Sequence, residues 1–514
     1  MGWDLIVVGA GSAGAVVAAR AAGRGHRVLL LEAGPDVRPA TLPEVWRSPN
    51  PVRALRDPAA GTHLLQRGLL SRRTEAQAAT PYFQGRGTGG SSSINGQIAI
   101  RPPMADFTDW AAAGCTGWAP EDVLPHLREM EDDEEFGDAP WHGRGGPIPV
   151  HRTPRERWGA VDAALCDAAV AAGYGWAPDL DAPGAAGASP YPVNSRDGRR
   201  VTTCDAYLEP ARALPELTVR CGAVVDRVLL SGSRAVGVRV LVDGAMTEEF
   251  ADRVVLSAGA VHSPAILQRS GFGPAERLRA LGVDVVADLP AGRGLQDHPS
   301  AFVGMPLQPR WAAGSDERHT NVCVRWSSGA APGDLMFVAC NQNVLALSRA
   351  DGRDGAGALL VWGNQVHSRG EVLLDSADPL AQPALEQRML SDPRDRQRLR
   401  TGVRALLDLA RGDRVQDLTD GTFDEVNADL LAAFDDDRAL DEHLLRTATD
   451  AQHLSSSCRM GAPDDPDAVV DPDCRVLGAE GLHVADASVL PSCPRANTNF
   501  ATIAVGEVLA DRLG

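Results

Sequence analysis

Two side chains near the end of the sequence have the types needed to move a proton. His453 opens the run His-Leu-Ser-Ser-Ser-Cys, and Asn497, 44 residues later, opens Asn-Thr-Asn-Phe. An imidazole accepts or donates a proton near neutral pH, and a carboxamide donates or accepts a hydrogen bond. Residues 481–490 are typical of a buried strand that breaks into a turn at Asp486, which would bring the pair together. The result would be an imidazole able to accept a proton beside a carboxamide, although most histidines near a loop are structural.

The elements that must position this pair begin at the N-terminus. Residues 4–8 are an apolar run of the buried parallel-strand type, followed by a glycine-rich turn, an alanine-rich helix and a second strand over 27–32. This βαβ order predicts a turn that binds a dinucleotide pyrophosphate, with Glu32 on the ribose hydroxyls. A glutamate in place of an arginine at this position disfavours a dinucleotide that carries a 2′-phosphate, such as NADP. The predicted contacts are Gly9, Gly11, Ser12, Ala13, Gly14, Glu32 and Ala33.

Composition limits the classes of partner. With 514 residues and a net charge of -18, the chain lacks the basic face that nucleic acid or an anionic membrane surface requires. It contains no lysine, which excludes Schiff-base chemistry and a lysine P-loop. The nine cysteines form neither a disulfide pattern nor zinc-ligand spacing, so we expect no metal. No apolar run is long enough to span a membrane and no basic leader precedes the first strand, which predicts a cytoplasmic location.

Short strand signals recur in the middle of the chain, over 217–220, 224–230, 235–242 and 248–257. Their turn signals predict a β-meander that returns to the nucleotide-binding unit. A separate run of small residues, 85–96, lets backbone N–H groups approach a flat, electron-rich ring, and Asn95 can bond its polar edge. A flexible glycine and serine linker is the alternative interpretation of this run.

Five ordered blocks of sequence resemble the glucose-methanol-choline (GMC) family of FAD-dependent oxidoreductases. They are the N-terminal turn, residues 85–96, residues 259–273, residues 294–298 and the two C-terminal runs. The resemblance implies that Arg86, Gly89, Gly90, Asn95 and Gly96 contact the flavin. Two positions depart from the family pattern, since Thr88 and Phe272 stand where aliphatic residues are usual.

The resemblance also implies further FAD contacts and the mode of attachment. Val225 matches a position that contacts adenine in similar proteins, although an ordinary place in a core strand explains this valine equally well. Small-residue turns at strand ends are where a dinucleotide lies in such sheets. The additional predicted contacts are Val225, Ala258, Gly259, Asp486, Ala487, Thr498 and Asn499. Some members attach the flavin through a histidine where this chain has Ile94, so we expect noncovalent FAD.

The implied fold is α/β (α+β), with a Rossmann-like FAD-binding domain and a discontinuous, mixed-sheet substrate-binding domain. We predict the first domain over 1–154, 197–300 and 452–514, and the second over 155–196 and 301–451. The middle of the second domain carries no site motif. Four aromatic residues there are more typical of a core than of a pocket: Trp311, Trp326, Phe337 and Trp362.

The implied reaction is oxidation of the CH–OH group of an alcohol by hydride transfer to flavin N5. His453 would be the base and Asn497 would hold the alcohol oxygen, while electrons pass to oxygen or another acceptor. An FAD-containing lyase of the same fold, with a redox-silent flavin, is the alternative. An NAD-linked dehydrogenase or a noncatalytic flavin-binding module would use only the N-terminal turn. The other histidines, His298, His262 and His483, are predicted to be structural, and Cys458 and Cys493 to be packing residues.

Overall fold

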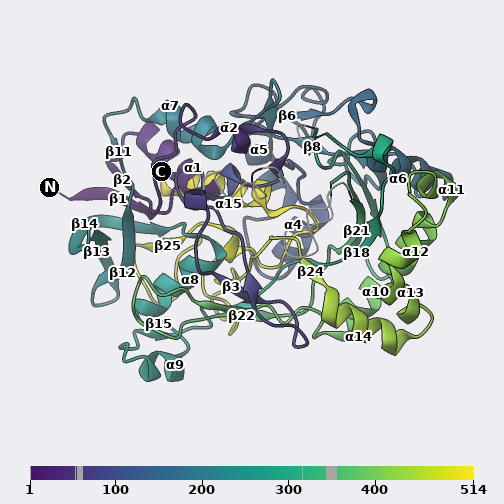
Figure 1. Cartoon of the computed structure of the whole chain (residues 1–514). Coiled ribbons are helices and arrows are strands. Elements are labelled where there is room, and N and C mark those ends of the chain that lie inside the picture. Colours follow the sequence, from purple (N-terminus) through teal and green to yellow (C-terminus); the bar gives the residue numbers. More distant parts are fainter. Residues whose placement is uncertain (1, 52–53, 55–61, 315–316, 343–355) are drawn as a thin grey trace.

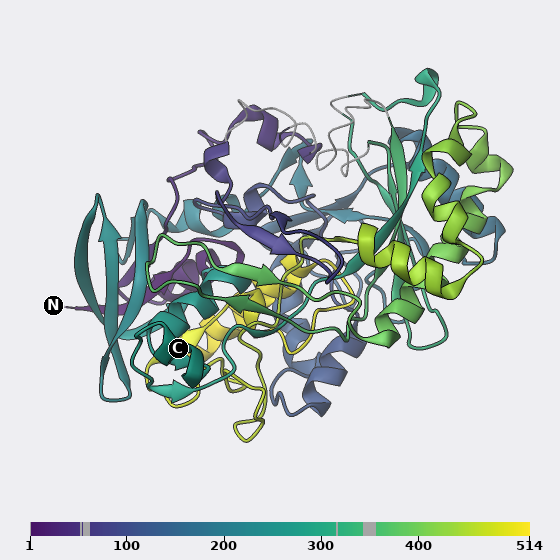
Figure 2. The ribbon, with the colours of Figure 1, turned by 60° about the horizontal axis from the view of Figure 1, so that its bottom comes forward.

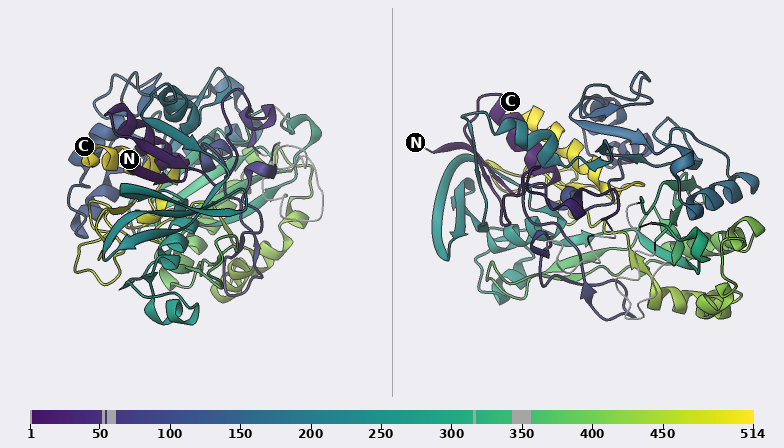
Figure 3. Two further views of the ribbon diagram at one scale, coloured as in Figure 1. Left: turned by 90° about the vertical axis from the view of Figure 1, so that its left-hand side faces the viewer. Right: turned by 45° about the horizontal axis from the view of Figure 1, so that its top comes forward.

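The protein is described by a computed structural model covering residues 2–51, 54, 62–314, 317–342 and 356–514. The predicted irregular stretch around residues 35–83 lies partly outside these ranges. Figure 1 shows a meander of strands at one end and a group of helices, α10 to α14, at the other. Both termini lie toward the meander end in the right-hand view of Figure 3. No helix in the described ranges has the length and hydropathy of a membrane span.

A seven-stranded sheet forms the nucleotide-binding side. Its order is β11-β2-β1-β14-β13-β12, and β25 pairs with β14. The strands are β1 (Trp3–Val8), β2 (Val28–Leu31), β11 (Leu217–Arg220), β12 (Ala223–Ser231), β13 (Arg234–Val242), β14 (Ala245–Leu256) and β25 (Leu482–Val484). The first half of β14 pairs antiparallel with β13, and its second half pairs parallel with β1 and β25. The prediction that β11 belongs to the meander is wrong, because it pairs parallel with β2 at the opposite edge.

Two helices cover this sheet and carry cavity residues at their N-termini. Helix α1 (Ser12–Gly23) follows the first turn, and the buried helix α15 (Thr498–Leu513) ends the chain against it. A Cβ at Gly506 would lie 2.9 Å from the Ala13 carbonyl oxygen, so glycine permits this close crossing. Helix α8 (Gly259–Arg269) starts directly after β14. The predicted strand-then-turn pattern is therefore confirmed at the end of β1, β14 and β25.

A six-stranded sheet forms the other side, in the order β24-β18-β21-β20-β19-β7, and all its neighbouring strands pair antiparallel, which corrects the predicted mixed sheet. Its strands are β7 (Gly187–Pro190), β18 (Pro299–Met305), β19 (Val322–Trp326), β20 (Leu335–Cys340), β21 (Gly357–Gly363) and β24 (Thr449–Asp450). The helices near it are α6 (Ala160–Ala171), α10 (Pro393–Ala410), α11 (Asp413–Gln416), α12 (Phe423–Val426), α13 (Ala428–Ala433) and α14 (Asp437–Thr447). Figure 2 shows the green helices among them at the end away from the meander. The core of this side is apolar and separate from that of the first sheet.

A five-stranded sheet, β17-β22-β23-β3-β4, joins chain segments from both predicted domains. Its strands are β3 (Leu70–Arg72), β4 (Thr80–Pro81), β17 (Arg293–Leu295), β22 (Gly370–Leu373) and β23 (Ala384–Glu386). The remaining strands are β5 (Glu131–Asp133), β6 (Ile148–Arg152), β8 (Pro192–Val193), β9 (Ser195–Arg196), β10 (Arg199–Arg200), β15 (Phe272–Gly273) and β16 (Ala287–Asp288). The remaining helices are α2 (Glu44–Arg47), α4 (Met104–Ala112), α5 (Pro120–Glu129), α7 (Glu209–Ala211) and α9 (Ala275–Ala280). The fold class is α/β with mixed sheets, as predicted, and the domain boundaries stay a prediction.

Candidate active site

A cavity of about 740 Å³ runs from Glu32, at the end of β2, to His453 and Asn497. It brings together nearly all the residues that the sequence singled out. The predicted residues on its wall are Gly9, Gly11, Ser12, Ala13, Glu32, Ala33, Arg86, Gly90, Asn95, Gly96, Val225, Ala258, Gly259, His453, Asp486, Ala487, Asn497, Thr498 and Asn499. Gly14 and Gly89 do not line it. Eight separate chain segments therefore contribute predicted residues to one wall.

Glycines let two turns meet at the β1 end of the cavity. Gly9 has φ +100°, and a Cβ there would lie 2.4 Å from the Ser257 carbonyl oxygen. A Cβ at Gly90 would lie 2.7 Å from the Gly11 Cα atom. At Gly14, a Cβ would lie 1.9 Å from the Gly9 carbonyl oxygen, so this glycine serves helix packing behind the wall. Such a narrow, glycine-lined passage fits the close backbone approach of a pyrophosphate.

Gly89, the other predicted contact off the wall, shapes the second turn. Its backbone adopts φ +90° before the 3₁₀ helix η2 (Gly90–Ser93), and its N–H donates to the Ala10 carbonyl at 2.8 Å. Thr88 departs from the family pattern. Its hydroxyl accepts a hydrogen bond from the Val37 backbone N–H and donates one to the Val37 carbonyl, each at 2.7 Å. Both residues therefore fix the course of the chain beside the cavity.

The Glu32 carboxylate has a larger structural role than the sequence predicted. Its oxygens accept the backbone N–H groups of Ala10 at 2.9 Å, Gly34 at 2.8 Å and Gly87 at 3.0 Å. A carboxylate has about four acceptor positions, so one is left for a ribose hydroxyl. Glu32 thus ties three turns together at the same place where a dinucleotide ribose would lie.

Asn95 presents a donor to the cavity because its acceptor is already used. Its Oδ1 accepts the Gln97 backbone N–H at 2.9 Å and Arg200 Nη1–H at 2.7 Å. The amide NH₂ is left for a ligand. Two further wall residues have buried acceptors without a partner among the described residues, Gln84 at Oε1 and Asn497 at Oδ1. Donors and acceptors of this kind fit the polar edge of a flavin ring.

Asp486 holds the last strand turn against the start of α8. Its carboxylate accepts the Gly259 N–H at 2.8 Å, the Ser263 hydroxyl at 2.5 Å and the Ser488 N–H at 2.8 Å. Burial raises its pKa despite these bonds. Val225, on β12, also lines the cavity while its side chain is buried in the sheet core. These positions suit contacts along the middle and adenine end of a dinucleotide.

His453 and Asn497 meet at the far end of the cavity, as the sequence predicts. The distance from His453 Nε2 to Asn497 Nδ2 is 3.1 Å. Asn497 occupies the N-cap of α15, yet its side chain makes no capping bond. Asparagine is among the best N-cap residues, so this side chain gives up a stabilising bond in order to face His453.

His298 fixes the tautomer of His453. The Pro494 carbonyl, which only accepts, lies 2.8 Å from His298 Nε2, so that nitrogen carries the proton. His298 Nδ1 is then an acceptor, and it lies 2.9 Å from His453 Nδ1, which must donate. The lone pair of His453 therefore sits on Nε2, the atom that faces Asn497. Sequence reasoning assigned His298 a structural role and missed this contact.

One carboxylate holds the backbone of both histidines. Asp297 accepts the backbone N–H groups of His298 at 2.8 Å, His453 at 2.9 Å and Ala451 at 3.2 Å. The residue before His453, Gln452, has φ +61°, a conformation that costs energy outside glycine and clusters at functional sites. Burial and the nearby Asp450 charge raise the pKa of Asp297 well above its usual range.

Burial keeps both imidazoles neutral. It lowers the pKa of His453 well below 6.5, and the neighbouring His298 lowers it further. Burial likewise lowers the pKa of His298 to about 4. Asp297, His298 and His453 could offer three metal ligands, but the two Nδ1 atoms already share one proton. The arrangement is that of a neutral base with a fixed lone pair.

Trp362 is the second residue that sequence reasoning missed. Its ring lies 5.5 Å from the His453 ring at 82°, and 6.4 Å from His298 at 6°. It lines the cavity, which corrects its predicted place in the core, whereas Trp326 and Phe337 pack with the second core. His262 also lines the cavity, while His483 is buried in β25 as predicted. No local signal distinguished Trp362 from the other aromatics.

Comparisons with known proteins match the whole chain. Profiles of GMC oxidoreductases match residues 3–300 and 366–506. The 5-(hydroxymethyl)furfural oxidase of Methylovorus sp. (strain MP688) is 34% identical over 99% of this chain and 98% of its own length. The oxygen-dependent choline dehydrogenase of Paraburkholderia xenovorans (strain LB400) is 36% identical over 99% and 94%. The crystal structure of pyridoxine 4-oxidase from Mesorbium loti superposes with a TM-score of 0.87 at 29% identity, covering 99% of each chain.

These relatives match the chain from end to end, including the segments that build the cavity. The lyase alternative finds no support among them. The glycine-lined passage, the Glu32 carboxylate and the free donors and acceptors of the wall are the features that an FAD needs. The chain belongs to the GMC oxidoreductase family and is an FAD-dependent enzyme that oxidises the CH–OH group of an alcohol.

Proposed function

We propose that His453 is the base that removes the hydroxyl proton of the alcohol, and that Asn497 holds the alcohol oxygen. The observation that carries this proposal is the chain of hydrogen bonds from Pro494 through His298, which leaves the lone pair of His453 on Nε2. Asn497 Nδ2 lies 3.1 Å from that atom, so it can donate to an oxygen that lies beside the pair, within hydrogen-bond reach of both nitrogens. A base must lie within hydrogen-bond reach of the proton that it takes, and this geometry allows it.

Bound FAD supplies the hydride acceptor of the reaction. The protein's own contribution is to orient the alcohol and to keep a neutral imidazole ready. Because burial lowers the pKa of His453, the side chain is unprotonated at neutral pH. The apolar residues Val338, Leu360 and Trp362 on the facing wall exclude water from the reacting atoms. They also provide contact surface for the body of the alcohol.

The other residues on the cavity wall are assigned to the parts of FAD that they would contact. Gly9 and Gly11 would lie at the pyrophosphate, Glu32 at the ribose and Val225 near adenine. Arg86, Asn95, Gly96, Thr498 and Asn499 would contact the flavin ring. Noncovalent attachment is supported by Ile94, whose aliphatic side chain has no atom to bond to the flavin. Acid precipitation should therefore release all the yellow colour into the supernatant, whereas colour retained in the pellet would contradict it.

The experiment that tests the proposed function is anaerobic mixing of the FAD-loaded protein with primary alcohols, aryl alcohols and polyols. Reduction bleaches the flavin absorbance in the absence of oxygen, and at least one class should do so. The apparent rate should rise with pH through the pKa of His453 and then stay level, with its acid limb below pH 6.5. A limb at or above 6.5 would argue against a buried neutral base. Failure of every alcohol to bleach the flavin would contradict the proposed oxidation.

The final electron acceptor is either oxygen or another oxidant. Once an alcohol has bleached the flavin, air and an artificial dye can be added in separate experiments. Rapid recovery of the yellow colour in air identifies an oxidase, and recovery with the dye alone identifies a dehydrogenase. The relatives include an oxidase and an oxygen-dependent dehydrogenase by name, so oxygen is the first acceptor to measure.

A further inference from the structure

Two buried arginines lie behind the part of the cavity wall that Asn95 and Gly96 form. Arg200, on β10, and Arg318 are 4% and 8% exposed. Arg200 Nη1 donates to Asn95 Oδ1 at 2.7 Å and to the Ser92 carbonyl at 3.1 Å, and Arg318 Nη2 donates to the Gly96 carbonyl at 2.6 Å. Asn95 and Gly96 line the cavity. Each guanidinium group therefore contacts a residue that lines the cavity.

Neither arginine has a carboxylate within ion-pair distance in the described part of the chain. Five other buried arginines have such a partner: Arg101, Arg152, Arg269, Arg398 and Arg495. Arg325 is also buried and has none among the described residues, but it donates to the Leu180 carbonyl at 3.0 Å and not to a residue of the cavity wall. Arg200 Nη2 and Arg318 Nε and Nη1 are buried without any hydrogen-bond partner among the described residues. The acids that act on the pair from farther away are Asp205 and Asp162. A buried charge without a paired charge is costly and is expected to have a function.

The effect of the two charges reaches the cavity. Besides burial, the charges of Arg318 and Arg200 lower the pKa of His319, which lines the cavity next to Gly96, to about 3. Burial lowers the pKa values of Arg200 to about 9 and of Arg318 to about 10, so both stay charged at neutral pH. Thr320 Oγ1 and His319 Nδ1 on this wall also lack partners among the described residues.

No acid on the cavity wall offsets this charge at the substrate end. The acidic residues of the lining are Glu32 and Asp486, at the dinucleotide end, and Asp450. Asp450 is already bound to Arg73 at 2.7 Å, with Gln387 and Gln452 as further donors. An ammonium group placed beside His319 would meet the two guanidinium charges in a desolvated site, where repulsion is weakly screened.

We propose that Arg200 and Arg318 keep the substrate end of the cavity at positive potential, so that the enzyme selects neutral or anionic alcohols and rejects alcohols that carry an ammonium group. The proposal rests on the alcohol oxidation proposed above. It separates this chain from the choline dehydrogenases that it resembles, since choline is a quaternary ammonium alcohol.

Three compounds of similar shape and different charge test the proposal. They are choline, whose charge is at its trimethylammonium end, the neutral alcohol 3,3-dimethylbutan-1-ol, and the anion 3,3-dimethylbutanoate, whose carboxylate takes the place of the CH₂OH group. The wild-type enzyme should show a kcat/KM for the neutral alcohol at least tenfold above that for choline. The anion, which is not oxidised, should bind more tightly than choline in a titration of the flavin absorbance.

Arg318→Met and Arg318→Lys form a matched pair, because Arg318 makes a single hydrogen bond and lysine keeps its charge. Arg318→Met should lower the preference for the neutral alcohol and the affinity for the anion by tenfold or more, whereas Arg318→Lys should change both by less than threefold. Equal behaviour of the two variants, or a wild-type enzyme that prefers choline, would overturn the proposal. Thermal unfolding of both variants checks that they are folded.

A second measurement does not depend on turnover or on the fit of these compounds. The midpoint potential of the bound FAD should be about 30 mV lower in Arg318→Met, which corresponds to a tenfold change in a two-electron equilibrium. Arg318→Lys should keep the wild-type potential. An unchanged potential in Arg318→Met contradicts the proposed field. If no alcohol bleaches the flavin, the proposed oxidation fails, while the potential still decides the role of the arginine pair.

Discussion

Two buried histidines in this protein differ in their charge, although burial acts on both in the same direction. His453, at the cavity, is 8% exposed, and His142, in the loop between β5 and β6, is fully buried. Burial and His298 lower the pKa of His453 well below 6.5. Burial also opposes the charge of His142, but hydrogen bonds to Asp179 and Glu131 outweigh it and raise the pKa to about 9.

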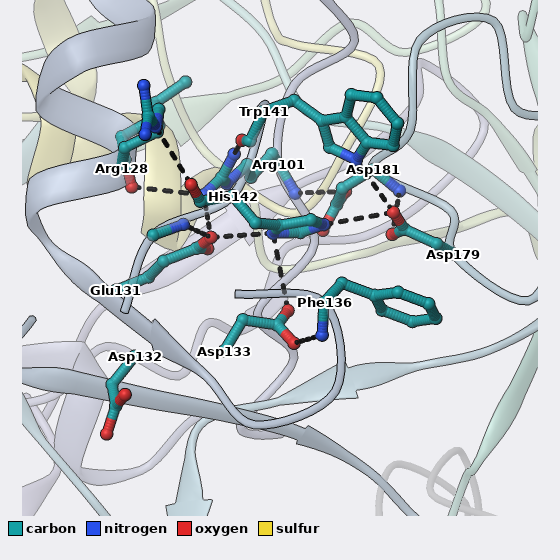
Figure 4. A network of polar contacts seen from close by, with 12 residues as sticks. Arg101, Arg128, Glu131, Asp132, Asp133, Phe136, Trp141, His142, Asp179 and Asp181 are labelled. Carbon is teal, nitrogen blue, oxygen red and sulfur yellow. Dashed lines mark hydrogen bonds and ion pairs between the residues drawn. The ribbon is translucent and has the colours of Figure 1, made fainter. Parts of the chain in front are cut away.

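The partners of His142 explain the contrast (Figure 4). Its Nδ1 lies 2.7 Å from Glu131 Oε1 and its Nε2 lies 3.1 Å from Asp179 Oδ2, so both ring nitrogens donate. Arg101 pairs with Glu131, and Arg152 with Asp133 at 2.8 Å. Glu131, Asp133 and His142 have the composition of a metal site, yet bound arginines and a protonated imidazole leave no free ligands there.

A buried imidazole can act as a base only if one of its ring nitrogens keeps a lone pair. His453 has a neutral acceptor, His298, on one nitrogen and an amide on the other, so it keeps a lone pair. His142 has carboxylates on both sides, so it is a cation that joins the β5–β6 segment to the segment around Asp179. One histidine is available for chemistry, and the other stabilises the fold.

The largest expected effect separates the two histidines by activity. His453→Gln should lower kcat/KM for the best alcohol by about 10²–10⁴-fold, because the general base is lost. Its free energy of unfolding should change by only about 1 kcal/mol, since no charged group is left unpaired. His142→Gln should keep wild-type activity per folded molecule. Stopped-flow flavin reduction together with denaturant unfolding measures both quantities, and a large activity loss in His142→Gln would erase the distinction.

The next effect separates them by stability. His142→Gln leaves the Glu131 and Asp179 carboxylates without their shared cation, which should cost about 3–5 kcal/mol of unfolding free energy. His483→Gln is the matched control, because His483 is buried in β25 and burial lowers its pKa to about 4. It should cost much less. Chemical denaturation at pH 7 compares the two, and equal losses would mean that the ionic network contributes nothing.

A pH series should show opposite signs for the two sites. The folded pKa of His142, about 9, lies above the value of 6.5 in the unfolded chain, so its contribution is complete below pH 6.5 and is lost as pH rises through 9. The lost part is about 3 kcal/mol at 1.36 kcal/mol per pKa unit. His453 acts in the reverse sense, because its folded pKa is depressed and its burial opposes folding below pH 6.5.

Unfolding free energies of the wild type and His142→Gln, measured from pH 6 to pH 10, test the alkaline part. The difference between the two proteins should shrink as the pH rises. A constant difference across this range would show that His142 is not protonated in the folded state. Measurements of His453→Gln from pH 5 to pH 7 test the acid part, where this variant should lose less stability than the wild type does.

The sequence predicted the parts of the site that local signals encode. The strand, turn and helix at Gly9 and the small-residue run at Gly90 follow from conformations that glycine alone allows, and the structure places both on the cavity wall. The pairing of His453 with Asn497 followed from a family resemblance and a strand between them, and the structure brings the two side chains within hydrogen-bond distance.

Features that depend on long-range contacts could not be predicted from the sequence. The contact between His298 and His453 joins residues 155 positions apart, and no motif states which nitrogen of a histidine donates. Trp362 resembles three other tryptophan and phenylalanine residues until β21 places it at the cavity. Strand β11 lies next to the meander in sequence, yet it pairs with β2 because that edge of the parallel sheet is open.

The smallest predicted effect concerns His298, which makes His453 different from His142 by accepting the hydrogen bond of its Nδ1–H group. His298→Leu removes the acceptor at Nδ1 of His453, so both tautomers become accessible and only part of the protein has the lone pair on Nε2. We expect kcat/KM to fall by about 10–100-fold, less than for loss of the base itself. His298 also lowers the pKa of His453, so its removal should move the acid limb of the pH profile upward. His298→Asn, whose amide oxygen can accept near the Nδ1 position, should restore part of the rate and of the limb. If both variants lose activity equally and the limb stays in place, His298 is a packing residue, and the lone pair of His453 is fixed by Asn497 alone.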